Sequence, residues 1–315
     1  MPATTNEDRR RARPRRSMLA LPGSNQRFVE KSTTLPADAL LIDLEDAVAA
    51  NAKALAREVT SRALASLDFA DRVVTVRVNA WSSGLTIGDL IAIVTSSATR
   101  LDAIALPKTN SAAEVVALDL VLHDLEFAAG LTIGSIGIDV LIESALGLAN
   151  VDEICMASAR VDSVALGRAD LSASLGMPAL VGGADVSAYG GDHFHFILSK
   201  VLLAARVAGI LALDGPYLRL DDDAGLRALA TRAAVLGFDG KWAIHPDQVA
   251  ILNEVFTPSR EDVARAEAIL GTLDDAATDK ALGALRDGGE MLDEASRKMA
   301  LAVLGRARGY REVEA

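Results

Sequence analysis

Short hydrophobic runs alternate with longer amphipathic stretches along most of the chain, from about residue 17 to residue 256. The runs are rich in Val, Ile, Leu and Ala, which predicts buried strands, and the stretches between them have helical spacing. The predicted strands are Ser17–Leu21, Ala39–Leu44, Val73–Asn79, Ala103–Leu106, Ile136–Ile142, Ser163–Leu166, Ile210–Leu213 and Lys241–Ile244. Because repeated strand–helix units build parallel sheets, these runs predict an α/β fold, a TIM (β/α)8 barrel over residues 17–256.

Helix-compatible sequence fills the connections, for example Lys53–Leu67 and Ser111–Leu125. After the eighth run, Thr257 and Pro258 are a good N-cap and first-turn pair for a further helix. The Gly-rich, charged stretch 279–290 is typical of a flexible connection, and a last helix is predicted over Asp293–Arg306. Residues 257–315 are therefore expected to form a C-terminal helical extension, either a lid or a subunit clasp.

Composition and charge exclude several classes of protein. The chain has 315 residues, of which 50% are hydrophobic, and a formal net charge of -11. This acidic balance argues against sequence-independent binding to nucleic acid, and no uncharged apolar run is long enough to cross a membrane. Cys155 is the only cysteine. An intrachain disulfide and a cysteine-based structural metal site are therefore excluded, and a cytoplasmic location is expected.

The first sixteen residues form a basic segment with Arg at positions 9, 10, 11, 13, 15 and 16. No apolar stretch of the kind found in signal peptides follows it. We interpret residues 1–16 as a solvated, disordered tail, with a nucleic-acid-binding arm as the alternative.

Polar residues follow nearly every predicted strand, at the end of the barrel where active sites of this fold lie. They are Ser24, Glu45–Asp46, Arg77 with Asn79, Lys108, Glu143, Arg168 with Asp170, Asp214 and His245. Carboxylates are frequent among them, and no set rich in His or Cys accompanies them. Oxygen ligands favour a hard ion, so the pattern indicates Mg2+ or Mn2+ rather than Zn2+.

Glu143 and Asp170 follow the neighbouring fifth and sixth strands, so both carboxylates could face one ion. The alternative is that each only caps the helix that follows it.

Arg77 and Asn79 alternate along the third strand and are expected to point into the barrel mouth. A guanidinium there suits a carboxylate or enolate oxygen, and the alternative is a buried ion pair with Glu45 or Asp46. Lys108 could neutralise a phosphate or carboxylate, or be an ordinary exposed loop residue.

Read in order, these segments resemble the HpcH/HpaI aldolase and citrate lyase beta subunit family, and its malyl-CoA and β-methylmalyl-CoA lyases in particular. The resemblance runs from about Arg16 to Arg306. Its segments are 16–25, 41–48, 76–79, 106–108, 141–147, 165–170, 214–216 and 240–246, with residues 253–258 closer to the malyl-CoA branch.

The resemblance implies a set of roles. Glu143 and Asp170 would be ligands of Mg2+, which also binds the keto acid glyoxylate. Arg77 would stabilise the enolate and alkoxide oxygens, and Glu45 and Asp46 would support Arg77 and metal-bound water. Asp293 would transfer a proton in the active site of a neighbouring subunit, which implies a homo-oligomer, a trimer or hexamer. Ser24, Arg27, Lys31 and Lys53 would bind the phosphates of coenzyme A.

The resemblance further implies reversible Claisen-type cleavage of (3S)-malyl-CoA or β-methylmalyl-CoA to acetyl-CoA or propionyl-CoA plus glyoxylate. Three alternatives remain: citramalyl-CoA cleavage, which releases pyruvate, malyl-CoA thioester hydrolysis, and a citrate lyase beta-type subunit acting on an acyl carrier protein. Arg168 departs from the family pattern, which has a small or acidic residue there. Its guanidinium would either repel Mg2+ or bind an additional substrate carboxylate.

Overall fold

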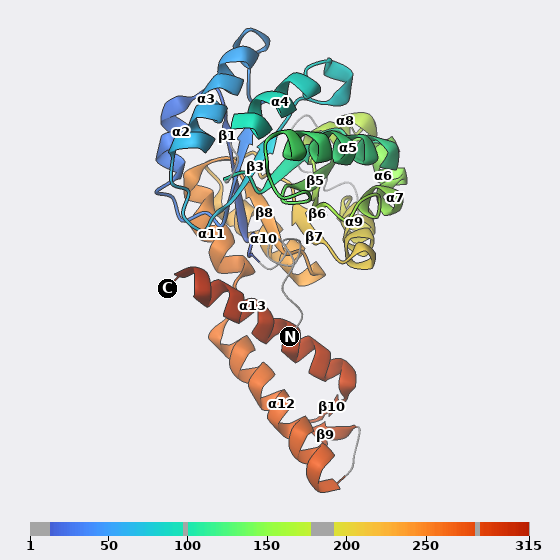
Figure 1. Ribbon diagram of the computed structural model, residues 1–315. Coiled ribbons are helices and arrows are strands. Elements are labelled where there is room, and N and C mark those ends of the chain that lie inside the picture. Colours follow the sequence, from blue (N-terminus) through green and yellow to red (C-terminus); the bar gives the residue numbers. More distant parts are fainter. Residues whose placement is uncertain (1–12, 97–99, 178–191, 281–283, 315) are drawn as a thin grey trace. The chain divides into compact units, whose positions relative to one another are not determined.

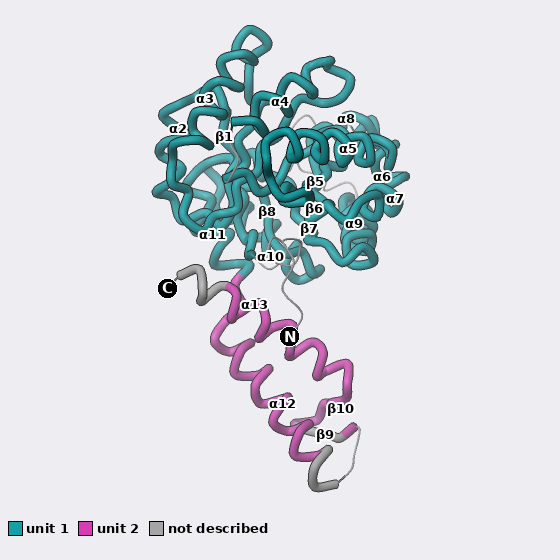
Figure 2. Tube along the Cα trace, viewed as in Figure 1, with its two compact units in different colours: residues 1–256 teal, residues 257–315 magenta. Residues whose placement is uncertain are grey.

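The chain divides into two compact units, residues 1–256 and 257–315 (Figure 2). The structure is a computed structural model that describes residues 13–96, 100–177, 192–280 and 284–314. Within these ranges, no helix combines the length and hydrophobicity needed to cross a bilayer.

Eight parallel strands form the closed barrel of the first unit (Figure 1). They are β1 (Ser17–Pro22), β2 (Ala39–Asp43), β3 (Val73–Arg77), β4 (Ala103–Leu106), β5 (Gly137–Ile142), β6 (Val161–Leu166), β7 (Leu211–Asp214) and β8 (Gly240–Ala243). Each strand pairs with the next in sequence, and β8 closes the ring against β1 in the register Met18 to Trp242. The predicted TIM barrel is confirmed.

At least one helix follows each of the eight strands, and these helices surround the barrel. They are α2 (Gln26–Ser32), α3 (Lys53–Ser66), α4 (Thr86–Ser96), α5 (Ala112–Ala128), α6 (Ala145–Ala149), α7 (Val151–Cys155), α8 (Arg168–Ser174), α9 (His195–Ala208), α10 (Asp223–Leu236) and α11 (Pro246–Phe256). Local signals set their ends. A capping box formed by Ser111 and Glu114 begins α5, and Gly209 and Gly237 end α9 and α10 in the left-handed conformation.

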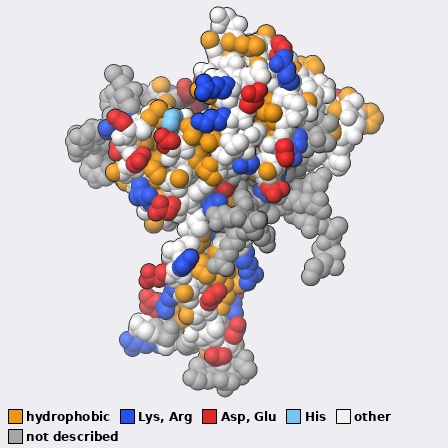
Figure 3. Space-filling model, turned by 90° about the vertical axis from the view of Figure 1, so that its left-hand side faces the viewer, with side chains coloured by type: hydrophobic (Ala, Val, Ile, Leu, Met, Phe, Trp, Pro, Cys, Tyr) orange, Lys and Arg blue, Asp and Glu red, His pale blue; other side chains and the backbone are white. Residues whose placement is uncertain are grey.

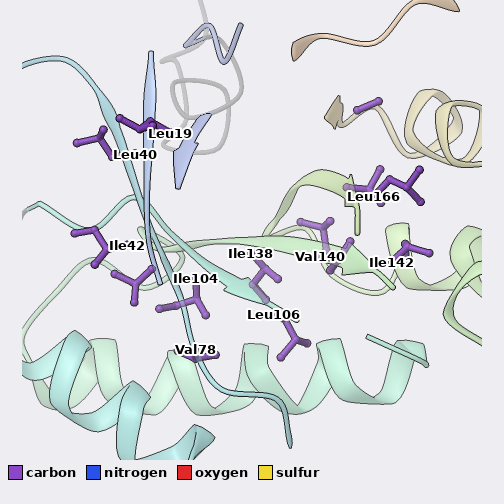
Figure 4. Close-up of a cluster of buried hydrophobic side chains, with 14 of the residues drawn as sticks. Leu19, Leu40, Ile42, Val78, Ile104, Leu106, Ile138, Val140, Ile142 and Leu166 are labelled. Atoms are coloured by element: carbon purple, nitrogen blue, oxygen red, sulfur yellow. The ribbon is translucent and has the colours of Figure 1, made fainter. Parts of the chain in front are cut away.

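Alternation along the strands separates two hydrophobic layers. Leu40 and Ile42 of β2 belong to the layer between the strands and the helices, which Figure 4 shows in close-up. Ala39 and Leu41 belong to a second cluster, made with residues such as Leu141 and Trp242, that fills the barrel interior. Side chains alternate between the two faces of a strand, so the last inward-pointing residues of β2 and β3 lie at the carboxyl-terminal mouth of the barrel.

Part of the N-terminal segment lies against the barrel, which differs from the predicted tail over residues 1–16. Arg15 and Arg16 are buried, and they pair with Asp139 at 2.7 Å and Asp38 at 2.9 Å. Arg13 pairs with Asp102. Arg15 and Arg16 are held there because the buried carboxylates of Asp139 and Asp38 require a cationic partner. Residues 1–12 lie outside the described part.

The second unit contains two packed helices and a small hairpin. They are α12 (Arg260–Lys280), α13 (Glu294–Glu314), β9 (Leu285–Asp287) and β10 (Glu290–Leu292). The N-cap of α12 is Ser259, which exchanges hydrogen bonds with Asp262, so the predicted cap at Thr257 is wrong. The stretch 279–290, predicted as a flexible connection, carries β9 and the start of β10. Gly288 and Gly289 supply the positive φ values, 53° and 96°, that the hairpin turn requires.

Candidate active site

The centre of the candidate site is an ion pair between neighbouring strands. Asp43 and Arg77 are register partners on β2 and β3, and Arg77 Nε and NH2 donate to the two Asp43 oxygens at 2.7 and 2.6 Å. Backbone N–H groups of Glu45 and Ala47 also donate to Asp43. Burial alone would raise the pKa of Asp43, but Arg77 and these N–H groups hold it below its ordinary value. Asp43 was not among the residues predicted from the sequence, although Ala39, Leu41 and Asp43 share one face of the strand.

The remaining edge of Arg77 faces two further carboxylates. Arg77 NH1 lies 3.4 Å from Glu45 and 4.0 Å from Glu143, and the guanidinium carbon is 5.8 Å from the centre of the Trp242 ring. Burial opposes the charge of Arg77, but Asp43 above all, followed by Glu45 and Glu143, raises its pKa. The expected ion pair with Glu45 is therefore present. Asp46 instead pairs with Lys108 at 3.1 Å.

Lys108 follows β4 and contacts both Glu45 and Glu143. Its Nζ donates to Glu45 Oε1 at 2.8 Å, and its backbone N–H donates to Glu143 Oε2 at 3.2 Å. Despite some burial, Glu45 and Asp46 raise the pKa of the Lys108 ammonium above its ordinary value. The residue is thus not an unattached loop lysine.

Glu143 is a buried carboxylate with a strongly altered acidity. Burial raises its pKa to about 7, and the charges of Glu45 and Asp170 add to this while Arg77 and Lys108 oppose it. Neither predicted capping alternative holds. Ser144 caps α6 by accepting the N–H of Gly147, and the N-cap of α8 is Gly167, so that Asp170 lies within the first turn.

These residues fit a hard divalent cation. The Oε2 atom of Glu45 is buried without a hydrogen-bond partner, and Glu143 is repelled by Glu45 and Asp170. A cation would relieve both costs, and two carboxylate ligands leave coordination positions for water and substrate oxygens. In the described ranges, no group of three or more His, Cys, Asp or Glu residues is arranged as a metal site. The candidate therefore depends on the pair Glu143 and Asp170.

Arg168 pairs with a buried carboxylate at the end of β7. Its Nε and NH2 donate to Asp214 at 2.9 and 3.1 Å, and its guanidinium lies 4.7 Å from the ring centre of Phe194. Asp214 also accepts from buried Lys241 at 2.6 Å. Although burial opposes ionisation, these two cations lower the pKa of Asp214 to about 2. The charge of Arg168 is thus compensated by a carboxylate outside the candidate metal pair.

Gly167, between β6 and α8, leaves the space that Glu143 occupies. A Cβ atom at this position would lie 2.4 Å from Glu143 Cγ and 2.6 Å from Glu143 Oε1. The side chain of Glu143 can therefore take this position only because residue 167 has none.

Substitution of Gly167 by Ala is expected to displace Glu143 and lower turnover by about 100-fold, because small misplacements in an active site have effects of that size. Overpacking should also cost about 1–3 kcal/mol in the free energy of unfolding. Steady-state kinetics and denaturant unfolding measure the two effects. Gly88→Ala is the matched control, since its Cβ would meet Arg57 at an ordinary 3.6 Å. Equal turnover in both variants would contradict the interpretation.

The four residues expected to bind coenzyme A are not equivalent. Lys53 Nζ donates to the backbone oxygens of Leu44 and Glu45 at 2.8 and 2.6 Å, so it holds the loop after β2. Ser24 is half-buried in the loop after β1, and Arg27 and Lys31 are exposed on α2. Lys31 borders a pocket of about 210 Å³.

This pocket lies between α2, β1 and the junction of β8 with α11. Its wall includes Leu19, Leu21, Phe28 and Ile244, with His245 also contributing. Figure 3 views the side of the molecule that carries α2 and α11, where hydrophobic side chains are interspersed with Lys and Arg. The pocket therefore combines an apolar wall with a nearby cation.

Asp293 belongs to the second unit, where it caps α13. Its Oδ1 accepts the backbone N–H groups of Ala295 and Ser296 at 2.9 and 3.1 Å.

Comparison with known proteins gives extended matches. The family model described as HpcH/HpaI aldolase/citrate lyase matches residues 16–246. An L-malyl-CoA/beta-methylmalyl-CoA lyase of Cereibacter sphaeroides is 40% identical over 305 residues, which covers 94% of this chain and 95% of the relative. Citrate lyase subunit beta of Escherichia coli is 36% identical, with 96% and 97% covered.

Solved structures agree with these matches. CitE from Mycobacterium tuberculosis, in complex with magnesium, acetoacetate and coenzyme A, has a TM-score of 0.75 at 29% identity, with 95% of this chain and 99% of that chain covered. A citrate lyase from Burkholderia xenovorans has a TM-score of 0.80 at 19% identity, with 93% and 92% covered, which supports the fold alone. The resemblance inferred from the sequence is confirmed: the chain belongs to the HpcH/HpaI aldolase/citrate lyase family and is a carbon–carbon lyase.

Proposed function

We propose that this lyase uses Mg2+ to cleave (3S)-malyl-CoA or β-methylmalyl-CoA reversibly into acetyl-CoA or propionyl-CoA plus glyoxylate. The observation that carries the proposal is the cluster at the barrel mouth, where Arg77 is fixed by Asp43 beside the buried carboxylate Glu143. The 40% identity to an L-malyl-CoA/beta-methylmalyl-CoA lyase supports the substrate class. Mn2+ is the alternative ion, because it accepts the same oxygen ligands.

Glu143 and Asp170 would hold the ion, with Glu45 and Asp46 nearby to bind its water. When bound, the ion would supply positive charge that polarises the oxygens of the keto acid. The chemical obstacle is the negative charge that develops as the carbon–carbon bond breaks. Arg77 NH1 lies on the edge of the guanidinium not bound by Asp43, so it can donate to an oxygen that gains charge in the transition state.

Proton transfer completes the reaction in the cleavage direction. A base removes the proton of the β-hydroxyl, the bond to the α-carbon of the thioester breaks, and the CoA enolate is protonated. We assign proton transfer to Asp293 from a neighbouring subunit, which makes the active enzyme a homo-oligomer, a trimer or hexamer. The contribution from a second chain is part of the proposal.

Binding of the CoA portion is assigned to the side of the barrel next to α2. Ser24, Arg27 and Lys31 lie there, and the pocket bordered by Lys31 offers an apolar wall beside a cation. Lys53 would contribute by holding the loop that carries Glu45 rather than by contacting phosphate. The complex of CitE from Mycobacterium tuberculosis with magnesium, acetoacetate and coenzyme A supports binding of coenzyme A in general. The single, buried Cys155 is consistent with the proposed cytoplasmic location.

Incubation of the purified protein with Mg2+, one acyl-CoA and one keto acid tests the proposal. We expect acetyl-CoA or propionyl-CoA to condense with glyoxylate, and a chelator to stop the reaction, as followed by mass spectrometry of the thioesters. Preference for pyruvate would indicate citramalyl-CoA instead. Release of free CoA with intact malate would indicate a thioesterase, and turnover only with an acyl carrier protein would indicate a citrate lyase beta-type subunit. Failure of every pairing would reject the lyase assignment.

A further inference from the structure

Lys108 has a backbone conformation that lysine rarely adopts. Its φ is 50°, and in the described ranges only Ala70 shares a positive φ among residues other than glycine. Such conformations are strained for a residue with a Cβ atom and are found at functional sites more often than elsewhere. A glycine at this position would relieve the strain but could not provide an ammonium group.

The ammonium group of Lys108 acts on the same carboxylate as Arg77. Glu45 Oε1 accepts from Lys108 Nζ at 2.8 Å, whereas Glu45 Oε2 has no hydrogen bond and lies 3.4 Å from Arg77 NH1. Glu45 is buried, so its charge requires a cationic partner whether or not the Lys108 ammonium is present. Without the ammonium, the nearest remaining cation would be Arg77.

The position of Glu45 affects NH1, the guanidinium nitrogen of Arg77 that faces the barrel mouth. Asp43 binds Nε and NH2, which leaves NH1 toward Glu45 and Glu143. If Glu45 turned toward NH1 and formed a full hydrogen bond, it would occupy one of the two N–H groups of this nitrogen and leave fewer donors for a substrate oxygen. The two cations therefore compete for one carboxylate.

We infer that Lys108 is a positioning residue that keeps Glu45 at ion-pair distance from Arg77 without a hydrogen bond between them, so that both N–H groups of Arg77 NH1 remain available to the reacting oxygen. The inference rests on the proposed function for the role of Arg77. It goes beyond that proposal because it assigns the separation of Glu45 and Arg77 to a third residue and to its left-handed backbone.

Four variants separate this role from simple structural support. Lys108→Met keeps a long side chain without the charge, Lys108→Arg keeps the charge, and Lys108→Gly removes the charge and the backbone strain. Ala70→Gly is the matched control, because it relieves the same kind of strain outside the site. Each is compared with the wild type in kcat, thermal midpoint and Mn2+ affinity measured by electron paramagnetic resonance.

We expect Lys108→Met to lower kcat by about 10- to 100-fold, because a key donor is displaced. Mn2+ should bind roughly threefold more tightly, since the acidic mouth has lost a cation. Lys108→Gly should lower kcat similarly, but its thermal midpoint should lie roughly 2–4 °C above that of Lys108→Met, because it also relieves the backbone strain. Ala70→Gly should raise the midpoint with unchanged kcat, and Lys108→Arg should recover most of the activity.

A crystal structure of Lys108→Met makes the test independent of turnover. The inference predicts that Glu45 Oε2 moves from 3.4 Å to hydrogen-bond distance of Arg77 NH1. An unchanged separation overturns it, as do wild-type kcat in Lys108→Met or a joint loss of stability and Mn2+ affinity. Wild-type protein without lyase activity would instead reject the proposed function, and the Glu45 position would still decide the inference.

Discussion

Replacement of Glu143 by Gln is expected to abolish metal-dependent turnover, with kcat reduced by about 10³-fold or more. The neutral amide keeps the shape of the side chain but provides a much weaker ligand for a hard cation, and loss of the metal charge costs several kcal/mol of transition-state stabilisation. Asp170→Asn should have a similar effect, because the two carboxylates would share the ion. Initial rates measured across a Mg2+ titration test both variants.

The same substitution should stabilise the metal-free protein at neutral and alkaline pH. The folded protein raises the pKa of Glu143 from 4.5 to about 7, so it binds this proton more tightly than the unfolded chain does. The contribution of this bound proton to the free energy of unfolding is complete below pH 4.5 and is lost as the pH rises through 7. Over this range, the free energy of unfolding of the wild type should therefore fall by about 3 kcal/mol relative to that of Glu143→Gln. Denaturant unfolding at several pH values, with chelator, measures the difference.

Saturating Mg2+ should reverse the order of stability, because the ion binds the wild type more tightly than the variant. Glu254→Gln is the control, since Glu254 pairs with Arg227 on the surface. Full activity in both Glu143→Gln and Asp170→Asn would reject the proposed metal site. A constant stability difference between pH 4.5 and 8 would contradict the raised pKa.

Substitution of Arg77 by Lys should lower kcat by about 100-fold or more, although the charge is conserved. A guanidinium can bind Asp43 through two donors and still direct NH1 toward the mouth, whereas an ammonium is a single point of charge. The lost donor would act mainly in the transition state, so kcat should fall more than the KM for the keto acid changes. Steady-state kinetics in both substrates give this comparison.

A matched substitution separates the site from general effects of exchanging Arg for Lys. Arg227→Lys changes a surface arginine that also contacts a carboxylate through two nitrogens, and it should leave kcat unchanged. Thermal unfolding checks that Arg77→Lys remains folded, since Asp43 is almost fully buried and depends on its cation. Unaltered kcat in folded Arg77→Lys would exclude a direct role for the guanidinium.

Local sequence patterns predicted most of the barrel. The run Ala103–Leu106 agrees with β4, and the predicted helix Lys53–Leu67 differs from α3 by one residue. Differences occur mainly at strand ends, where Val73–Asn79 was predicted and β3 ends at Arg77. Strand ends depend on where the neighbouring strand stops offering hydrogen-bond partners, which the sequence of one segment does not specify.

Charged residues were harder to assign than hydrophobic ones. The sequence pointed to Arg77, Glu45 and Glu143, and the structure brings these side chains together. The sequence did not identify Asp43 as the main partner of Arg77. Lys108 was most simply interpreted from the sequence as a loop residue. The arginines at 15 and 16 were expected in solvent, yet they lie buried against Asp139 and Asp38.

The amino-acid sequence is enough to predict the alternation of strands and helices, the family, and the candidate carboxylates at the ends of β5 and β6. Hydrophobic periodicity and short motifs are local, so they can be read along one segment. The pairing of acids with bases depends on the folded barrel instead: Asp43 pairs with Arg77, Lys108 with Glu45, and Asp214 with Arg168. An ion pair depends on the distance between side chains from different strands, and that distance exists only once the barrel has closed.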